Sequence, residues 1–265
     1  MATSTIENQK IVSRAEWLAA RKDLLAKEKE LTRTRDQLSR QRRELPWVRV
    51  DKNYVFETAA GKRTLAELFD GRSQLLIYHF MFGPGWNEGC VGCSFLCDHV
   101  EGALPHLGQH DVSFVAVSRA PLSEIDPFKK RMGWTFNWVS SGESDFNYDY
   151  QVSFPKDEVT RGKVYYNFEM QDLPSEEMSG TSVFYKASDG NIYHTYSCYA
   201  RSGEGLLGTY YLLDLTPKGR NERRDMTDWV RHHDRYQAGG LVLPSGRYQA
   251  SEKADCGCHA SENHS

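Results

Sequence analysis

Two nearly continuous apolar runs stand near the middle of the chain, at residues 75–82 and 112–117. Runs of this length without alternation are typical of strands that are buried on both faces. Between them lie a Gly-rich loop and then a stretch, ending near Gly108, that predicts a helix. Strand, helix and strand follow within about 45 residues, which predicts the βαβ unit of a parallel sheet.

The first 45 residues have a helical pattern instead. Ser13 and Glu16 match the capping box of a helix start, and Pro46 stops the helix, so we expect it to end near Glu44. One apolar stripe recurs at every seventh position, formed by Trp17, Leu24, Leu31, Leu38 and Leu45. The second seam position is small or polar, so the coiled-coil signal is weak. We therefore predict a long surface helix whose stripe packs on the domain or on a neighbouring subunit.

Further strands and helices are expected on both sides of the βαβ unit. Residues 47–50 and 54–57 predict a strand pair or one kinked strand. Residues 123–132 predict a helix and residues 134–139 a third strand.

The second half of the chain has a weaker pattern, which begins near residue 140 and ends near residue 180. It predicts an insertion with one short strand at residues 164–166. Two strand-like runs then flank Asp189-Gly190, which is a strong hairpin signal. Helices are expected at residues 205–213 and 225–236, followed by a loose tail.

These patterns divide the chain into three parts. Residues 1–45 form an N-terminal arm and long helix, and residues 46–237 form an α/β domain with an insertion at about 140–180. Residues 238–265 are expected to be a flexible C-terminal tail, because they are rich in Gly and Ser.

Charge and composition limit the classes of partner and the cellular compartment that we expect for this protein. The net charge is -3, which argues against nucleic acid as a partner. Residues 1–45 hold 11 Lys/Arg and 7 Asp/Glu, whereas the remainder holds 22 and 29. The basic arm is therefore expected to dock on an acidic surface, such as that of a second subunit in a homodimer. No apolar run approaches the roughly 18 residues of a membrane span, so no membrane is expected.

The six cysteines are too few for a disulfide scaffold in a chain of this length, and we expect a cytoplasmic location. Three of them, Cys90, Cys93 and Cys97, fall within eight residues. A C-x-x-C pair at the end of a buried strand and the start of a helix is the arrangement of thioredoxin-like redox proteins. Helix N-termini stabilise the reactive thiolate, so we assign Cys90 as the exposed nucleophile and Cys93 as the resolving partner. Cys97 is badly aimed for a disulfide with Cys93.

Several stretches together resemble a family of bacterial and fungal proteins catalogued as domain of unknown function 899. The matching stretches are Arg42 to Trp47, Gly89 to Phe95, Val117 to Leu122, Met132 to Trp134, Trp138 to Ser141, Asp145 to Asp149, His194 to Ser197 and Tyr199 to Arg201. The resemblance implies a thioredoxin-like fold. Together with the patterns described above, this predicts a central mixed sheet flanked by helices, a long N-terminal helix and an insertion before the final β-hairpin. It also implies a thiol-based activity, but no particular substrate.

One departure from thioredoxins concerns the loop opposite the cysteines. Thioredoxins have a cis-proline there, whereas residues 179–182 contain no proline. This argues against general disulfide reduction. The peroxiredoxin pattern Pro-x-x-x-Thr-x-x-Cys is also absent from the sequence.

Three hypotheses for function follow. The first is a thiol-disulfide oxidoreductase or thiol peroxidase that acts on a disulfide or peroxide and needs no cofactor. The second is a metal-thiolate protein that binds zinc or copper through Cys90, Cys93 and Cys97, with His79 or alternatively His99, His194 or Met81 as the fourth ligand. The third is a non-catalytic adaptor that works through its basic N-terminal helix.

The substrate pocket of the redox hypothesis has its own candidate residues. Trp86 is expected to wall the cysteines, and Gly180 and Thr181 to face them. Arg119 and Arg201 follow predicted strand ends, where α/β sheets bind ligands. The motif of Cys256, Cys258 and His259 in the tail could resolve a disulfide or carry a metal, but we favour no essential role for it.

Overall fold

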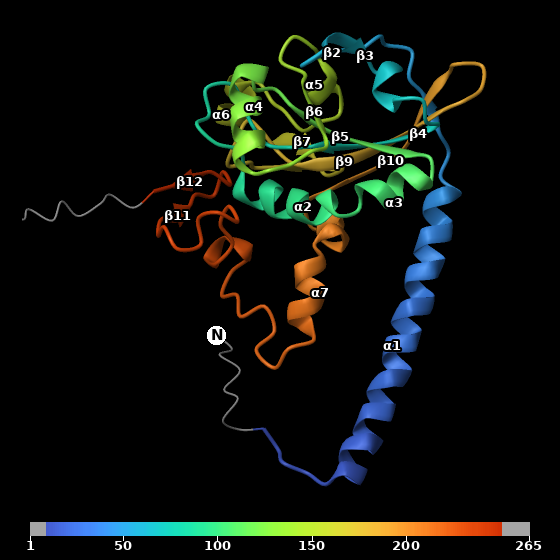
Figure 1. Cartoon of the computed structure of the whole chain (residues 1–265), viewed down its shortest axis with the longest axis vertical. Coiled ribbons are helices and arrows are strands. Elements are labelled where there is room, and N and C mark those ends of the chain that lie inside the picture. Colours follow the sequence, from blue (N-terminus) through green and yellow to red (C-terminus); the bar gives the residue numbers. More distant parts are fainter. Residues whose placement is uncertain (1–8, 251–265) are drawn as a thin grey trace, which may run out of the picture.

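The computed structural model describes residues 9–250. Its core is an eight-stranded mixed sheet with the strand order β1-β10-β9-β4-β5-β6-β2-β3 (Figure 1). Three central strands run parallel to one another, namely β4 (Gln74–His79), β5 (Val112–Ser118) and β6 (Asn137–Ser140). Two helices, α2 (Val91–Glu101) and α3 (Leu104–Gln109), connect β4 to β5, so the predicted βαβ unit is confirmed.

The predicted hairpin follows on the other side of β4. Strand β9 (Gly180–Lys186) pairs antiparallel with β4, and β10 (Ile192–Tyr199) pairs antiparallel with β9. The order β10-β9-β4-β5, with a helix between the two parallel strands, is that of a thioredoxin-like fold. The predicted α/β, thioredoxin-like fold class is therefore confirmed.

The two edges of the sheet differ from the sequence prediction. Strand β1 (Val48–Arg49) pairs with β10 at one edge. Strands β2 (Val55–Thr58) and β3 (Gly61–Thr64) form a hairpin at the other edge, where β2 also meets β6. The prediction that residues 47–50 and 54–57 pair or form one strand is wrong. The alternation of apolar and polar residues predicts that a strand forms. The strand with which it pairs depends on which edge of the sheet remains free.

The sheet separates two hydrophobic clusters. One lies on the face covered by α2 and α4 (Leu122–Arg131) and includes the cysteines. The other cluster includes Leu75, Ile77 and Phe146 on the opposite face. Since successive side chains of a strand point to opposite faces, Tyr78 of β4 joins the cysteine cluster whereas Ile77 does not.

Helix α1 (Arg14–Arg43) begins with the predicted capping box of Ser13 and Glu16. It extends away from the sheet, and none of its residues is buried (Figure 1). Its apolar stripe is about half exposed, with Leu31 at 53%. The stripe is therefore not packed on the domain, and packing on a neighbouring subunit stays a prediction.

The insertion between β6 and β9 contains two short helices, α5 (Phe146–Asp149) and α6 (Lys156–Arg161). The short strand predicted at residues 164–166 is confirmed as β7 (Val164–Tyr166), which pairs with β8 (Glu169–Gln171).

The C-terminal part differs most from expectation. After β10 come a 3-10 segment (Ala200–Leu206) and helix α7 (Gly208–Asp214), as predicted. The helix predicted for residues 225–236 is wrong, since only a 3-10 turn (Met226–Asp228) forms there. Where a loose tail was expected, β11 (Leu241–Val242) and β12 (Tyr248–Gln249) form a hairpin against the cysteine cluster. Tertiary contacts determine the conformation of this segment. Its side chains pack on the domain, and its backbone does not form the predicted helical turns.

Among residues 9–250, no helix combines the length and the apolar character needed to cross a bilayer.

Candidate functional site

The cysteine loop connects β4 to α2. Cys90 is the N-cap residue of α2, and its backbone N–H donates to the carbonyl oxygen of Met81 over 3.0 Å. Gly89 precedes it at a position without room for a side chain, since a Cβ atom would lie 2.6 Å from Phe80 and 2.8 Å from Phe128. The loop therefore presses its backbone against the aromatic core and places Cys90 at the first turn of the helix.

All three clustered cysteines are buried. Cys90 is 5% exposed, Cys93 is 2% exposed and Cys97 is fully buried. The prediction of an exposed Cys90 is wrong. The physical reason is the turn of the β11–β12 hairpin, where a Cβ atom built on Gly246 would lie 2.5 Å from the Cys90 sulfur.

The two cysteines of the C-x-x-C pair differ in acidity. A hydrogen bond from the Cys93 side chain, assisted by the backbone N–H groups of Cys93 and Gly92, lowers the pKa of Cys90 despite its burial. Burial raises the pKa of Cys93 well above its ordinary value. The thiolate at this pair therefore forms on Cys90, where the helix start supplies donors.

Cys97 has a different environment. Burial raises the pKa of its thiol well above the ordinary value, and the charges of Asp98 and Glu101 act in the same direction. The side chain is a packed hydrophobic group rather than a nucleophile.

His79 does not approach the cysteines. Its Nε2 atom lies 2.9 Å from the hydroxyl of Ser182, and its ring stacks on Phe146 and Tyr150 in the opposite cluster. Burial lowers the pKa of His79 to about 3.

Of the other proposed fourth ligands, Met81 packs in the cysteine cluster, whereas the two histidines bond to other groups. His99 bonds to Phe95 and Thr209, and His194 bonds to Ser197. In the part of the chain that the structure describes, no group of three or more His, Cys, Asp or Glu side chains is arranged to hold a metal ion. The predicted set of Cys90, Cys93, Cys97 and His79 does not assemble, because the sheet lies between His79 and the sulfur atoms. The tail motif of Cys256, Cys258 and His259 lies outside the described residues.

A pocket of about 440 Å³ opens beside Cys90 and Cys93. Three predicted pocket residues, Gly180, Thr181 and Arg201, line it. Gly180 comes close to the ring of Tyr199, so a larger residue would not fit there. The strand that faces the cysteines therefore presents small side chains to the pocket.

Two other candidates lie outside the wall of this pocket. Arg119 pairs with Glu177, with 2.6 Å between Nε and Oε1. Trp86 lies beneath the guanidinium of Arg247, 5.2 Å from the ring centre. Arg119 is thus engaged within the protein, and Trp86 contacts the C-terminal segment.

Sequence reasoning missed several residues of the pocket. Tyr78 and Cys198 contribute from β4 and β10, and Gly246 contributes from the C-terminal hairpin. The alternation of β4 could have placed Tyr78 opposite to His79. No local signal marks Gly246, because it reaches Cys90 from more than 150 positions away in the chain.

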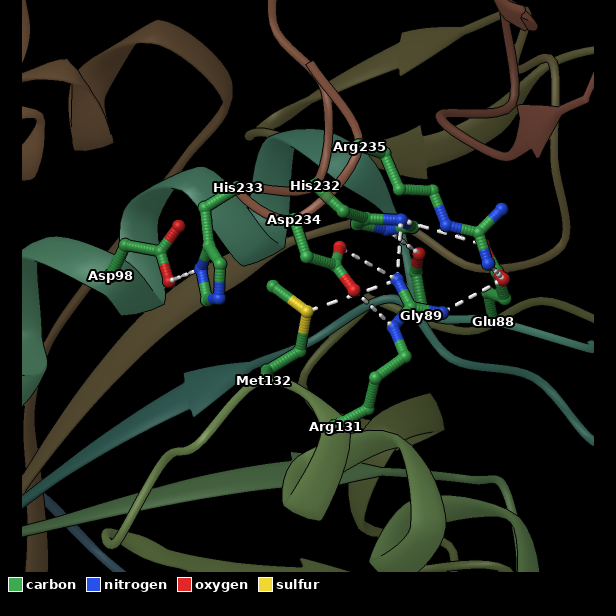
Figure 2. A network of polar contacts seen from close by, with 9 residues as sticks. All are labelled: Glu88, Gly89, Asp98, Arg131, Met132, His232, His233, Asp234 and Arg235. Atoms are coloured by element: carbon green, nitrogen blue, oxygen red, sulfur yellow. Dashed lines mark hydrogen bonds and ion pairs between the residues drawn. The ribbon is translucent and has the colours of Figure 1, made fainter. Parts of the chain in front are cut away.

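A polar network fixes the loop before Cys90 (Figure 2). His232 is fully buried, and its Nε2–H donates to the carbonyl oxygen of Gly89 over 2.9 Å. Glu88 accepts hydrogen bonds from Arg131 at 2.8 Å and from Arg235. Burial alone would raise the pKa of Glu88, but the bond from His232 and the two guanidinium charges outweigh it and lower the pKa. The C-terminal segment therefore holds the cysteine loop through a charged carboxylate.

Solved structures that resemble the chain include peroxidoxin BcpB from Mycobacterium tuberculosis, with 13% identity, a TM-score of 0.42, and coverage of 62% of this chain and 95% of that one. A PrxQ mutant from Xylella fastidiosa shows 13% identity, a TM-score of 0.42, and coverage of 63% and 94%. A peroxiredoxin Q mutant from Xanthomonas campestris shows 15% identity, a TM-score of 0.40, and coverage of 60% and 90%.

A search of curated proteins gave no match. A family model, however, matches residues 6–236, which is most of the chain and includes the cysteine loop, the pocket strands and His232. The predicted family resemblance is confirmed: the chain belongs to the family described as bacterial protein of unknown function, DUF899.

Proposed function

We propose that this protein is a thiol-based oxidoreductase in which Cys90 is the nucleophile and Cys93 resolves the oxidised intermediate. One observation carries the proposal: Cys90 caps helix α2 with a lowered pKa and lies in the wall of a pocket. A lowered pKa increases the fraction of thiolate at neutral pH, and the thiolate is the reactive form.

The first step is attack by the Cys90 thiolate on an oxidant. With a hydroperoxide, an S–O bond forms and the O–O bond breaks, so that Cys90 becomes a sulfenic acid. The leaving alkoxide or hydroxide takes up a proton and departs as alcohol or water. With a disulfide, Cys90 forms a mixed disulfide and a thiolate leaves.

The second step belongs to Cys93. Its sulfur attacks Cys90, an S–S bond forms, and the hydroxide or thiolate leaves with the proton that Cys93 loses. The effect that each side chain has on the pKa of the other supports this role, because such an effect requires the two sulfur atoms to be close. An external dithiol supplies two electrons to restore both thiols, and no cofactor enters the cycle.

The test is peroxide or disulfide turnover by the full chain with excess dithiol reductant. We expect Cys90→Ser to abolish turnover. In a separate reaction without reductant, we expect Cys93→Ser to stop after one equivalent, with a sulfenic acid or mixed disulfide on Cys90 detected by mass spectrometry. Cys97→Ala is the matched control, since Cys97 lies outside the pocket wall and should leave turnover intact. Turnover that persists in Cys90→Ser would refute the proposal.

Elemental analysis of protein purified without chelator separates this function from the metal-thiolate hypothesis. Stoichiometric zinc or copper that is lost in both Cys93→Ala and Cys97→Ala would favour a metal site instead.

A further inference from the structure

The turn between β11 and β12 lies directly on the nucleophile. Residues 241–249 form this hairpin, which we call the strap. The carbonyl oxygen of Gly246 accepts a hydrogen bond from the N–H of Val91 over 2.9 Å, one residue after Cys90. Gly246 has a φ of +78°, and no Cβ atom would fit between it and the Cys90 sulfur. The strap therefore covers Cys90 with bare backbone.

The strap is anchored around the site. The guanidinium of Arg247 lies over Trp86, and that of Arg235 lies over Tyr248 at 4.8 Å. Val242 and Tyr248 pack against the cysteine cluster. Covering Cys90 is thus a result of several contacts and not of one.

The strap affects the access of a small molecule to Cys90 differently from the access of a folded protein. In a mixed disulfide the two sulfur atoms are about 2.05 Å apart, so a protein substrate must bring its own chain over Cys90. The strap occupies that space. A small oxidant can instead reach Cys90 through the pocket, whose wall includes Tyr78, Leu96, Leu207, Tyr210, Met226 and Val230.

The charges at the pocket argue for a neutral oxidant. Arg220 pairs with Glu204 and Asp214, Arg201 also contacts Glu204 at 3.5 Å, and Arg224 pairs with Asp228. These guanidinium groups are already engaged with carboxylates, so they offer little to an anionic substrate. The largely apolar wall suits an uncharged molecule.

We propose that the strap is the specificity element that restricts Cys90 to small neutral hydroperoxides and excludes the disulfides of folded proteins. This inference rests on the proposed function of Cys90 and narrows its substrate class.

The test compares two oxidants in a Cys93→Ser background, which traps the first product on Cys90. The probes are cumene hydroperoxide and insulin, and mass spectrometry follows the sulfenic acid and the mixed disulfide over time. The key variant is Gly246→Val in the full chain, because its side chain must push the turn away from the sulfur. The matched control is Leu241→Ala, on the same hairpin but 64% exposed.

We expect the strap-intact chain to react with the hydroperoxide and to form the insulin adduct slowly. Gly246→Val should raise the insulin rate by about tenfold or more while changing the hydroperoxide rate less than about threefold, because only access by a bulky partner is relieved. Leu241→Ala should change neither rate. Equal insulin rates with and without Gly246→Val would overturn the inference.

A second pair of variants covers the case in which Gly246→Val fails to fold. Deleting residues 239–265 removes the strap, whereas deleting residues 251–265 keeps it and removes only Cys256, Cys258 and the rest of the tail. Only the first deletion should raise the insulin rate. If both deletions raise it equally, the tail and not the strap is the barrier, and the inference is wrong. If Cys90 reacts with neither oxidant in any variant, the proposed function itself fails.

Discussion

The ion pair of Arg119 and Glu177 yields a prediction that separates a structural role from a substrate-binding role. The carboxylate of Glu177 is 3% exposed and the Arg119 side chain is 16% exposed. Glu177 also accepts a hydrogen bond from Ser153 over 2.6 Å. Replacing Arg119 by Ala removes the cation and leaves the carboxylate buried with Ser153 as its remaining hydrogen-bond partner. Breaking a buried pair in this way costs roughly 3–5 kcal/mol of unfolding free energy, a large part of a typical stability of about 5–15 kcal/mol.

The same variant has a defined pH dependence. Burial raises the pKa of Glu177 above 4.5 in the folded protein, and the charge of Arg119 partly offsets this rise. Burial of a carboxyl group with a raised pKa costs least free energy when the group is protonated. The contribution of Glu177 to the free energy of unfolding is therefore fully present below the pKa of the unfolded state, and it is lost as the pH rises through the pKa of the folded state. Without Arg119 the folded pKa rises further. The stability deficit of Arg119→Ala should therefore be largest at pH 7 and should shrink near pH 4.5.

The assay is urea unfolding followed by tryptophan fluorescence at the two pH values. The control is Arg119→Ala combined with Glu177→Gln, which removes the buried charge and should recover most of the lost stability at pH 7. A loss of unfolding free energy below about 1 kcal/mol in Arg119→Ala, together with lost reactivity of Cys90, would refute this reasoning. It would support a substrate-binding role for Arg119 instead.

Three further predictions concern other parts of the molecule. Replacing Cys93 by Ala removes the hydrogen bond that lowers the pKa of Cys90. The rate at which iodoacetamide alkylates Cys90 at pH 7 should therefore fall by about two- to tenfold, and the pH profile of this rate should shift to higher pH. An unchanged profile would contradict the assignment of Cys93 as the donor. His79 has a pKa lowered to about 3, so folding stability should be lost as the pH falls below 6.5, by up to about 1.4 kcal/mol per pH unit. His79→Gln should flatten this acid loss in urea titrations without changing Cys90 alkylation, and a loss of Cys90 reactivity would revive the metal hypothesis. Deleting residues 1–43 should leave the unfolding free energy of the domain within about 0.5 kcal/mol, because none of the residues of α1 is buried, and should convert the proposed homodimer to a monomer in light scattering. An unchanged particle stoichiometry would refute dimerisation through this helix.

Local sequence patterns are sufficient to predict the centre of the molecule. The apolar runs of β4 and β5, the cysteines between them and the turn at Asp189-Gly190 all depend on local patterns. Such patterns act over a few residues, through burial on both faces of a strand or through the backbone needs of a turn. They predicted the parallel unit, the hairpin and the position of Cys90 at a helix start.

The surroundings of these elements depend on contacts between segments that are distant in the chain. Arg119 pairs with Glu177, which lies 58 positions away in the chain. His79 and the cysteines are close in the chain, but the sheet separates the His79 side chain from the sulfur atoms. Gly246 and His232 reach the cysteine loop from the C-terminal segment, where the local pattern predicted a helix and the composition a loose tail. Whether a nucleophile is exposed or covered depends on packing between distant segments, because burial is a property of the assembled surface and not of any local stretch.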